Sequence, residues 1–364
     1  TFSFDGISFA PEPGQGQVYI FKIFWILFYL ERNFMKLEEF CKALGKIDFF
    51  KKLEEIYDNF QKEYLLNIPD TCCGCILCCR PQNYIPSLEM DYLETFLNKY
   101  DVKPDIEGFK SYLLNRETPC CPYASKESGC IVYKARPMGC RTFGIFTLDK
   151  KRTLSEDCIF YGKEQIVITQ TDKHRFKVFA DLTVLKIEYC IVKAKDEEEK
   201  LEYFIILGEE YTRQGKYVDA ISIFKEVLKI RSDDPWIYLN LGCTYLFMNN
   251  LDMAKEKLEK GLELGGGEKF PELYLDSLLT LAEEYIGQNR ISEVITIVDS
   301  SEKIISDDLQ ILFRSGSIYS LMNNFSMAKE KLEKCLSMGG DKIFPSLYED
   351  LDFIYFNLKK FSKI

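Results

Sequence analysis

The residues best suited to chemistry are cysteines gathered in one short run. Cys72-Cys73-Gly74-Cys75-Ile76-Leu77-Cys78-Cys79 reads as C-x-x-C-x-x-C-C from its first residue. Two cysteines three apart allow one tight turn to present two thiolates to one metal ion, and repeating that step supplies a third. Neighbouring side chains diverge, so Cys78 and Cys79 do not easily share one tetrahedral ion. The run therefore predicts more than one metal ion, or a cluster.

Four cysteines further along the chain complete a set of eight candidate ligands. Eight thiols are enough for two four-thiolate sites. The chain holds one histidine, His174, which reads as a polar surface residue, so a metal site must be built almost wholly from sulfur. The candidate ligands are Cys72, Cys75, Cys78, Cys79, Cys121, Cys130, Cys140 and Cys158.

The order of these motifs resembles the YkgJ-type cysteine cluster family, a zinc- or iron-chelating domain. The first run is followed by Cys121-Pro122-Tyr123, Gly129-Cys130-x-x-Tyr133, Arg136-Pro137-x-x-Cys140-Arg141 and a final Cys158, and the resemblance covers residues 68–165. Ile76 stands where the family usually has glycine. The extra thiols Cys73 and Cys120 leave open a shift of either neighbouring pair by one residue. The resemblance implies a ligand set rather than a reaction.

Two kinds of metal remain open for these thiols. A C-x-x-C-x-x-C run with a remote Cys-Pro is similar to the ferredoxin arrangement that holds four irons, although Cys79 and the later thiols do not fit that scheme. Structural zinc accepts any four thiolates. We favour an iron–sulfur cluster or iron on ligand softness and spacing, with zinc as the alternative.

Three arginines lie close in sequence to the candidate ligands. Four thiolates on a divalent ion leave a site with two negative charges. Arg80, Arg136 and Arg141 are suited to offset this charge or to hydrogen-bond the sulfur atoms. The alternative is that these arginines pair with surface acids.

Composition limits the classes of function. The 364 residues allow two or three domains, and the net charge of −10 with a pI near 5.0 argues against nucleic acid as a partner. Fourteen cysteines without a convincing secretion signal indicate reduced thiols and a cytoplasmic location. The sequence shows no Ser/His/Asp arrangement, no H-E-x-x-H and no G-x-G-x-x-G motif.

The segments around the cysteines supply their scaffold. Residues 1–34 read as a leader or non-native segment, since the first methionine is Met35. The apolar run 18–30 is shorter than the roughly 20 residues that span a bilayer, so a docking strand or leader is favoured over a membrane anchor. Residues 35–67 show helical spacing and predict amphipathic helices that pack on the cysteine domain, with Asp48 as an N-cap.

Within residues 68–165 the pattern predicts one helix and one hairpin. The helix is expected over 87–100, opened by Ser87 as N-cap, and the hairpin joins 142–147 to 152–154. Residues 166–198 predict a connector whose first part is β-branched and whose second part, 178–195, is helical.

The last part of the chain, residues 199–364, repeats itself. Small residues recur at Gly208, Gly242, Ala282 and Gly316, at offsets of 34, 40 and 34 residues. The pattern resembles the tetratricopeptide family, with about four repeats and a partial fifth, in which small residues let two helices approach closely. Gly265-Gly266-Gly267 reads as a turn between repeats rather than a phosphate loop, because no strand precedes it.

The resemblance also implies a groove lined by the first helix of each repeat. Such a mixed and aromatic surface is suited to a protein or peptide partner, although two of its aromatic side chains could instead seal contacts between repeats. The expected groove residues are Glu209, Arg213, Trp236, Leu239, Phe247, Leu279 and Phe313.

The sequence thus predicts a mainly α protein in which a small cysteine-rich metal domain with a short β-hairpin precedes an α-solenoid. We expect a metal-binding protein that recruits a partner through its repeats. One alternative is an iron–sulfur-dependent oxidoreductase or a protein-lysine methylase, since relatives of the cysteine family are linked by name to flagellin methylation, although no methyl-donor pocket is visible in the sequence. The other is an adaptor in which zinc only staples the fold.

Overall fold

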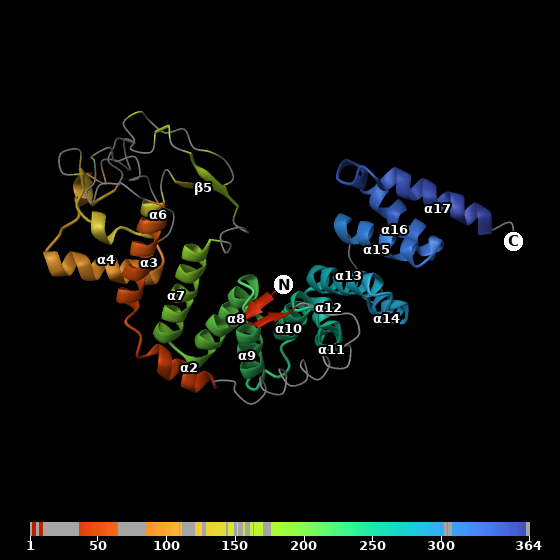
Figure 1. The fold of residues 1–364 in the computed structure, drawn as a ribbon, viewed down its shortest axis with the longest axis horizontal. Coiled ribbons are helices and arrows are strands. Elements are labelled where there is room, and N and C mark those ends of the chain that lie inside the picture. The colour runs from red at the N-terminus through yellow and green to blue at the C-terminus, as the bar shows by residue number, and fades with distance from the viewer. Residues whose placement is uncertain are drawn as a thin grey trace.

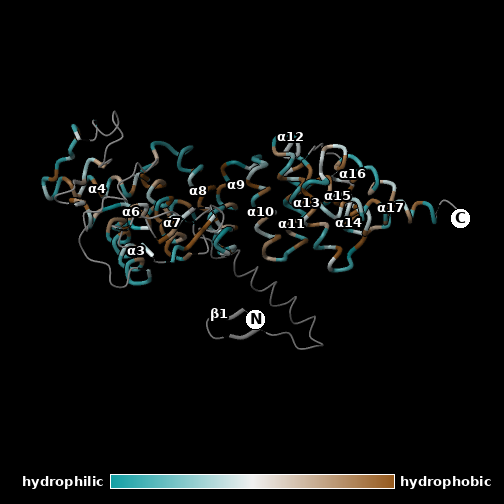
Figure 2. The backbone as a smooth tube through the Cα atoms, turned by 90° about the horizontal axis from the view of Figure 1, so that it is seen from above, coloured by the Kyte–Doolittle hydropathy of each residue, from teal (hydrophilic) through white to brown (hydrophobic). Residues whose placement is uncertain are grey.

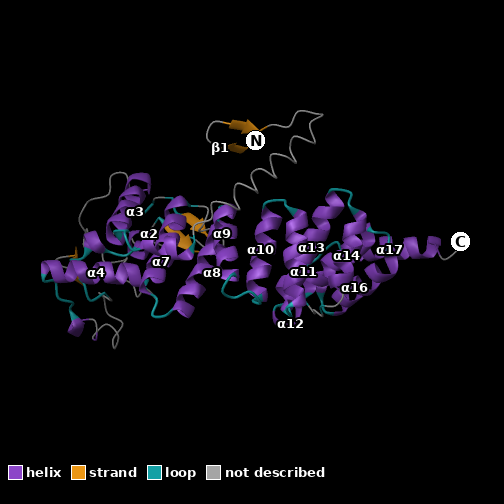
Figure 3. Ribbon diagram, turned by 90° about the horizontal axis from the view of Figure 1, so that it is seen from below, coloured by secondary structure: helices purple, strands orange, loops and turns teal. Residues whose placement is uncertain are grey.

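The fold is built almost wholly from helices (Figures 1 and 3). The computed structural model of the chain describes residues 2–4, 7–9, 36–64, 85–108, 110, 121–125, 129–142, 145–148, 151, 156, 161–162, 164–169, 176–301, 304 and 308–361. Among these residues, none of the helices combines the length and the apolar character that a membrane span requires. The apolar run 18–30 and His174 lie outside the described residues, and near the N-terminus β1 (Phe2–Phe4) pairs antiparallel with β2 (Ile7–Phe9).

Four helix pairs and one further helix form the described C-terminal part of the molecule. Hydrophobic and hydrophilic residues alternate along these helices (Figure 2), so each buries one face against its neighbours. The first helices of the repeats are α8 (Glu197–Arg213), α10 (Pro235–Phe247), α13 (Pro271–Gly287), α15 (Leu309–Leu321) and α17 (Leu347–Phe361). The second helices are α9 (Tyr217–Leu228), α11 (Leu251–Glu263), α14 (Ile291–Ser301) and α16 (Phe325–Ser337).

Glycines fix how closely the two helices of a pair approach. A Cβ placed on Gly242 would lie 2.6 Å from the side chain of Leu258, and one on Gly316 would lie 2.5 Å from Leu332. Real Cβ atoms do not come this close, so these positions need the smallest residue. This confirms the close approach predicted from the recurring small residues.

The turn inside each pair uses one backbone conformation four times. Gly215, Asn249, Asn289 and Asn323 have φ of 74°, 56°, 59° and 59°. Left-handed backbone favours glycine and, after it, asparagine. The sequence therefore places a residue that tolerates positive φ at the same point of each of these four pairs.

A second core lies at the opposite end of the molecule from α17, around α3 (Phe49–Tyr64) and α4 (Ser87–Tyr100) (Figure 1). Large side chains of α3, including Leu53 and Phe60, are fully buried there. The short elements beside them are β3 (Ala124–Ser125), β4 (Gly129–Cys130), η1 (Tyr133–Ala135), α6 (Met138–Arg141), β5 (Phe146–Leu148) and β6 (Ile166–Ile168).

Helix α7 (Lys177–Lys193) belongs to both cores. Its residues Val178 and Leu182 pack with α3, whereas Ile187 and Ile191 pack with the repeat helices. The predicted connector is therefore a packed helix shared by the two regions. Two small elements mark the joints between repeats, α12 (Gly266–Lys269) and η3 (Gly340–Lys342), and each follows a glycine with positive φ.

The structure corrects two predictions about the N-terminal helices. Helix α2 (Leu37–Leu44) packs on the repeats rather than on the described part of the cysteine domain, since Leu44 joins the repeat core and the rings of Phe40 and Phe204 lie 5.7 Å apart. Ser87 does not cap α4, because Pro86 occupies the N-cap in an extended conformation and no side chain caps the helix. The predicted cap at Asp48 is confirmed, as its carboxylate accepts from Lys51 N at 3.0 Å.

The predicted hairpin over 142–147 and 152–154 stays a prediction, because its second strand falls on residues that the structure does not describe. Strand β5 pairs in parallel with β6, with Phe146 opposite Ile166, and residues 152–154 lie outside the described residues. The β-branched run Ile166-Val167-Ile168 favours an extended strand, in agreement with this pairing. Within the described part of residues 68–165, an antiparallel pair joins β3 to β4.

Candidate functional site

Three of the eight candidate metal ligands lie within the described residues. Ala124 pairs with Cys130 across the β3–β4 ladder, and Ala124 N donates to Cys121 O at 3.2 Å. Cys121 and Cys130 therefore sit at the same end of this ladder. Cys140 lies on the short helix α6, and all three side chains are half-buried.

The described part of the chain does not assemble a metal site. No three His, Cys, Asp or Glu side chains gather there in a group that could hold an ion. The other candidate ligands, together with Arg80, lie outside the described residues, namely Cys72, Cys75, Cys78, Cys79 and Cys158. The metal site stays a prediction.

Arg136 and Arg141 lie over aromatic rings. The Arg141 guanidinium lies 3.9 Å from the centre of the Tyr57 ring, donates from Nε to Arg136 O at 2.9 Å, and also bonds Lys134 O. Burial lowers the pKa of Arg141 from its ordinary value. Arg136 lies 3.6 Å from the Tyr133 ring centre, and its buried Nε has no hydrogen-bond partner among the described residues. Their role toward sulfur stays a prediction.

A buried glutamate joins this region to the helices, and sequence reasoning missed it. Glu89 is 2% exposed. Its carboxylate accepts from Tyr57 Oη at 2.7 Å and from Met138 N at 2.6 Å, and it pairs with Lys186 Nζ at 2.7 Å. Burial and the neighbouring Glu89 raise the pKa of Tyr57. Because Glu89 holds the first amide of α6, it fixes the turn that carries Cys140.

An acid near the start of a helix is ordinary in sequence, since it favours the helix dipole. No signal in the chain marked Glu89 as the acid that meets α3, α6 and α7 at once. Only the packing of four elements reveals that role.

We define the first-helix face as the surface formed by α8, α10, α13 and α15. On this face Trp236 Nε1 donates to Glu209 Oε1 at 2.9 Å, and Trp236 packs on Phe270 with ring centres 4.9 Å apart. Trp236 is half-buried, so it seals a contact between repeats. Phe313 likewise stacks on Phe344, with ring centres 4.3 Å apart.

Two of the expected groove residues are instead core residues. Leu239 is 4% exposed and Leu279 is 1% exposed, because each turns toward the neighbouring helices of the solenoid. Arg213 is exposed and pairs with Glu210 of its own helix, with Nε 3.0 Å from Oε2. The groove prediction is therefore corrected at Leu239 and Leu279.

Phe247 is the groove residue that lies most openly on the surface. It is 65% exposed, although one side stacks on Tyr217 with ring centres 6.2 Å apart. Leu321, which the sequence reasoning did not select, is also 65% exposed. Its position is recoverable from the repeat, because Leu321 follows Phe247 by the combined offset of 74 residues that relates Gly316 to Gly242.

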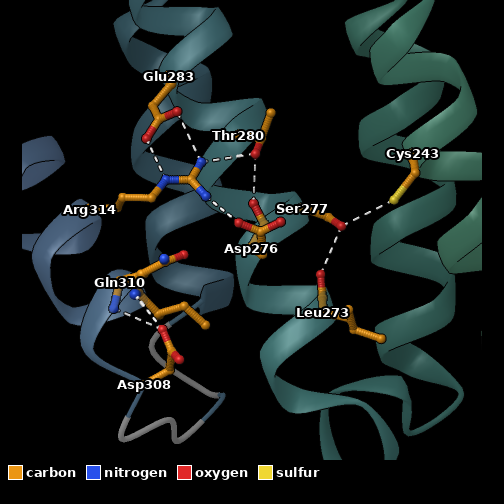
Figure 4. Close-up of polar contacts among 10 residues, drawn as sticks. Cys243, Leu273, Asp276, Ser277, Thr280, Glu283, Asp308, Gln310 and Arg314 are labelled. Carbon is orange, nitrogen blue, oxygen red and sulfur yellow. Dashed lines mark hydrogen bonds and ion pairs between the residues drawn. The ribbon is translucent and has the colours of Figure 1, made fainter. Parts of the chain in front are cut away.

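Arg314 forms a polar cluster between α13 and α15 that the sequence reasoning also missed (Figure 4). Its guanidinium donates to both oxygens of Glu283, at 2.8 and 2.9 Å, to Thr280 Oγ1 at 2.9 Å and to Asp276 Oδ1. Two carboxylates share one guanidinium, so this cluster keeps one net negative charge. The Asp276 side chain is 60% exposed and that of Glu283 is 44% exposed.

A surface hollow of about 780 Å³ lies beside the triglycine turn, between α11, α12 and α14. Its lining includes the carboxylates Glu259, Glu263 and Glu268 together with Gly265 and Gly267. Three carboxylates repel a phosphate group, so this hollow supports the interpretation of the glycines as an inter-repeat turn.

Comparison with protein-family models confirms the repeats. A TPR repeat model matches residues 208–248, and a tetratricopeptide repeat model matches residues 237–264 and 309–338. The chain therefore contains tetratricopeptide repeats. No curated protein matches the chain.

Solved structures overlap part of the chain. Two crystal structures of MamA are each 20% identical and cover 49% and 48% of this chain and 99% and 90% of their own, with TM-scores of 0.36 and 0.35. A thermophilic TPR protein of Thermus thermophilus is 21% identical and covers 43% of this chain and 82% of its own, with a TM-score of 0.29.

Proposed function

We propose that this chain is a protein-interaction scaffold whose repeats bind a segment of another protein on the first-helix face. The observation that carries the proposal is the exposure of Phe247 and Leu321, 65% each, at equivalent points of two repeats. Burying one such side chain against a partner contributes about 1.5–3 kcal/mol, so two of them give a peptide a firm hold. Tetratricopeptide repeats generally bind protein partners, which agrees with this use of the face.

A selection from a random peptide library tests the proposal. Peptides that bind the full chain are measured again against the double variant Phe247→Asp/Leu321→Asp, and we expect their affinity to fall at least tenfold. The matched control is Ile230→Asp, because Ile230 is 63% exposed but lies just after the second helix α9. Peptides that bind the double variant as tightly as the parent chain contradict the proposal.

Metal binding by the cysteine segment is the second candidate function. Its support is the spacing of the eight cysteines in the sequence, of which the structure describes Cys121, Cys130 and Cys140. Bound zinc would cross-link the cysteine segment and stabilise its fold, and an iron–sulfur cluster would supply electron transfer. The residues that would hold the metal are the eight predicted cysteines.

Metal analysis of anaerobically purified protein tests this candidate. We expect stoichiometric iron with acid-labile sulfide, or zinc in a colourless protein. Cys140→Ser is expected to lose metal, whereas Cys243→Ser is the control, because the Cys243 sulfur lies in the repeats 3.2 Å from Ser277 Oγ. Unchanged metal content in Cys140→Ser would exclude this residue as a ligand. The oxidoreductase and methylase alternatives and the cytoplasmic location stay predictions.

A further inference from the structure

The first helices α10, α13 and α15 end at Phe247, Gly287 and Leu321, and we call these three residues the rim. The same offsets that relate the repeats, 40 and 34 residues, relate these positions. Gly287 thus stands where its two neighbours carry large apolar side chains.

Hydrogen bonds between the helices show that the rim residues lie at one level. Arg314 of α15 bonds Thr280 of α13, and both helices advance seven residues from that contact to reach Leu321 and Gly287. Seven residues correspond to a rise of roughly 10.5 Å along each helix. On the other side, Gln288 Nε2 lies 3.4 Å from Asn249 Oδ1, which joins the ends of α13 and α10.

The rim has a gap at Gly287. A Cβ placed on this glycine would meet no atom within 4 Å, in contrast to Gly242 and Gly316, where it would clash. Gly287 also lacks the positive φ that would demand glycine. Close packing therefore does not require glycine here, and the position is left open between two exposed apolar side chains.

Acidic groups lie next to this gap on the same side of α13. Asp276, Thr280, Glu283 and Gly287 follow one another at steps of four, three and four residues, which places them along one stripe of the helix. The C-terminal end of α13 adds the partial negative charge of the helix dipole. Residues 201–364 hold 27 acidic and 19 basic residues, a net charge of −8 out of −10 for the chain.

From this arrangement we infer that the rim binds a protein segment that places a bulky apolar side chain over Gly287 and a lysine or arginine about one helical turn away. The apolar side chain lies between Phe247 and Leu321. The cation lies against Glu283 and Asp276, where Arg314 leaves one negative charge uncompensated. This inference rests on the proposed function and adds the chemistry of the partner.

Two peptide libraries of equal size test the inference on the full chain. Both fix a leucine or phenylalanine, and they differ in carrying arginine or glutamate four positions away. We expect at least tenfold enrichment of the arginine library. We also expect Asp276→Asn/Glu283→Gln to abolish the preference and its dependence on salt.

A second experiment fills the open position at Gly287 with a large side chain. Gly287→Trp is expected to weaken the selected arginine peptides at least tenfold while the thermal unfolding midpoint stays unchanged. The control Ile295→Trp alters an exposed residue of the second helix α14 and is expected to bind as the parent chain does.

The outcomes separate this inference from the proposed function. The inference is overturned, and the proposed scaffold function stands, if binding of the peptides depends on Phe247 and Leu321 but not on peptide charge. The same holds if the peptides bind Gly287→Trp as tightly as the parent chain. An equal or greater enrichment of the glutamate library also overturns it. Peptides that are indifferent to Phe247 and Leu321, or a complete absence of binding, overturn both.

Discussion

The two ends of the molecule are held together in different ways. In the repeats, a glycine of one helix meets a large side chain of the next, as at Gly242 and Leu258, and the arrangement recurs along the solenoid. In the N-terminal region, one carboxylate, Glu89, bonds groups of α3, α6 and α7. Repeated apolar contacts distribute stability over many equivalent places, whereas the polar cluster concentrates it in one residue.

This difference predicts how each region fails. A change at one seam of the solenoid affects its nearest neighbours, because each repeat contacts only those. Loss of Glu89 leaves several buried polar groups without a partner at once. Helix α7 belongs to both cores, so damage on either side also reaches the shared helix.

The largest effect is expected from Glu89→Ala. Removing this carboxylate leaves the buried Tyr57 hydroxyl and the Met138 N–H without an acceptor and breaks the ion pair with the half-buried Lys186, at a cost of about 3 kcal/mol. Circular dichroism melting is expected to show earlier unfolding of the N-terminal region with the repeat transition retained. Glu94→Ala, an exposed acid of the same helix, is the control, and equal melting of the two variants would contradict the prediction.

Gly242→Val is expected to have the next largest effect. The new side chain would overlap that of Leu258, and such overpacking costs about 1–3 kcal/mol. Urea unfolding of the variant measures this loss. Gly287→Val is the matched control, because its Cβ would meet nothing within 4 Å, and a similar loss there would refute the distinction between sealed and open glycines.

Asn289→Ala sharpens the description of the turns. At a φ of 59°, the left-handed backbone is expected to lower the free energy of unfolding of the alanine variant by about 1 kcal/mol, whereas Asn289→Gly is expected to retain full stability. Denaturant midpoints of the two variants give the comparison. If alanine and glycine behave alike, the left-handed conformation does not select the residue.

The smallest effect concerns Glu188, a half-buried residue of the shared helix α7. Burial raises the pKa of Glu188, an effect that Lys52 and Lys216 partly oppose. Because the pKa of Glu188 is raised, the folded state binds the proton more tightly than the unfolded state does. The contribution of protonated Glu188 to stability is therefore complete below the unfolded pKa of about 4.3. That contribution is lost as the pH rises through the folded pKa.

Glu188→Gln removes this dependence. The variant is expected to match the parent chain in stability near pH 4 and to exceed it slightly at pH 7, as measured by urea unfolding at both values. A parent chain that gains stability over the variant as the pH rises would reverse the assigned sign.

Sequence reasoning succeeded where contacts recur at fixed spacing. The seam at Gly316 and the pairing of helices in the repeats followed from offsets between residues, because near neighbours in sequence form these contacts. The reasoning failed at Leu239 and Leu279, which the repeat alone placed in the groove but which the lateral packing of the first helices buries. It also missed the parallel pairing of β5 with β6, which joins residues about twenty positions apart in the chain.

The sequence by itself determined the repeat and its close-packing glycines, because both depend on backbone geometry within a single repeat. The tertiary structure alone decided that Glu89 joins α3, α6 and α7, that α7 serves two cores, and that Gly287 stands open. Those features arise from residues far apart in the chain, and the space around a side chain exists only once its neighbours have packed.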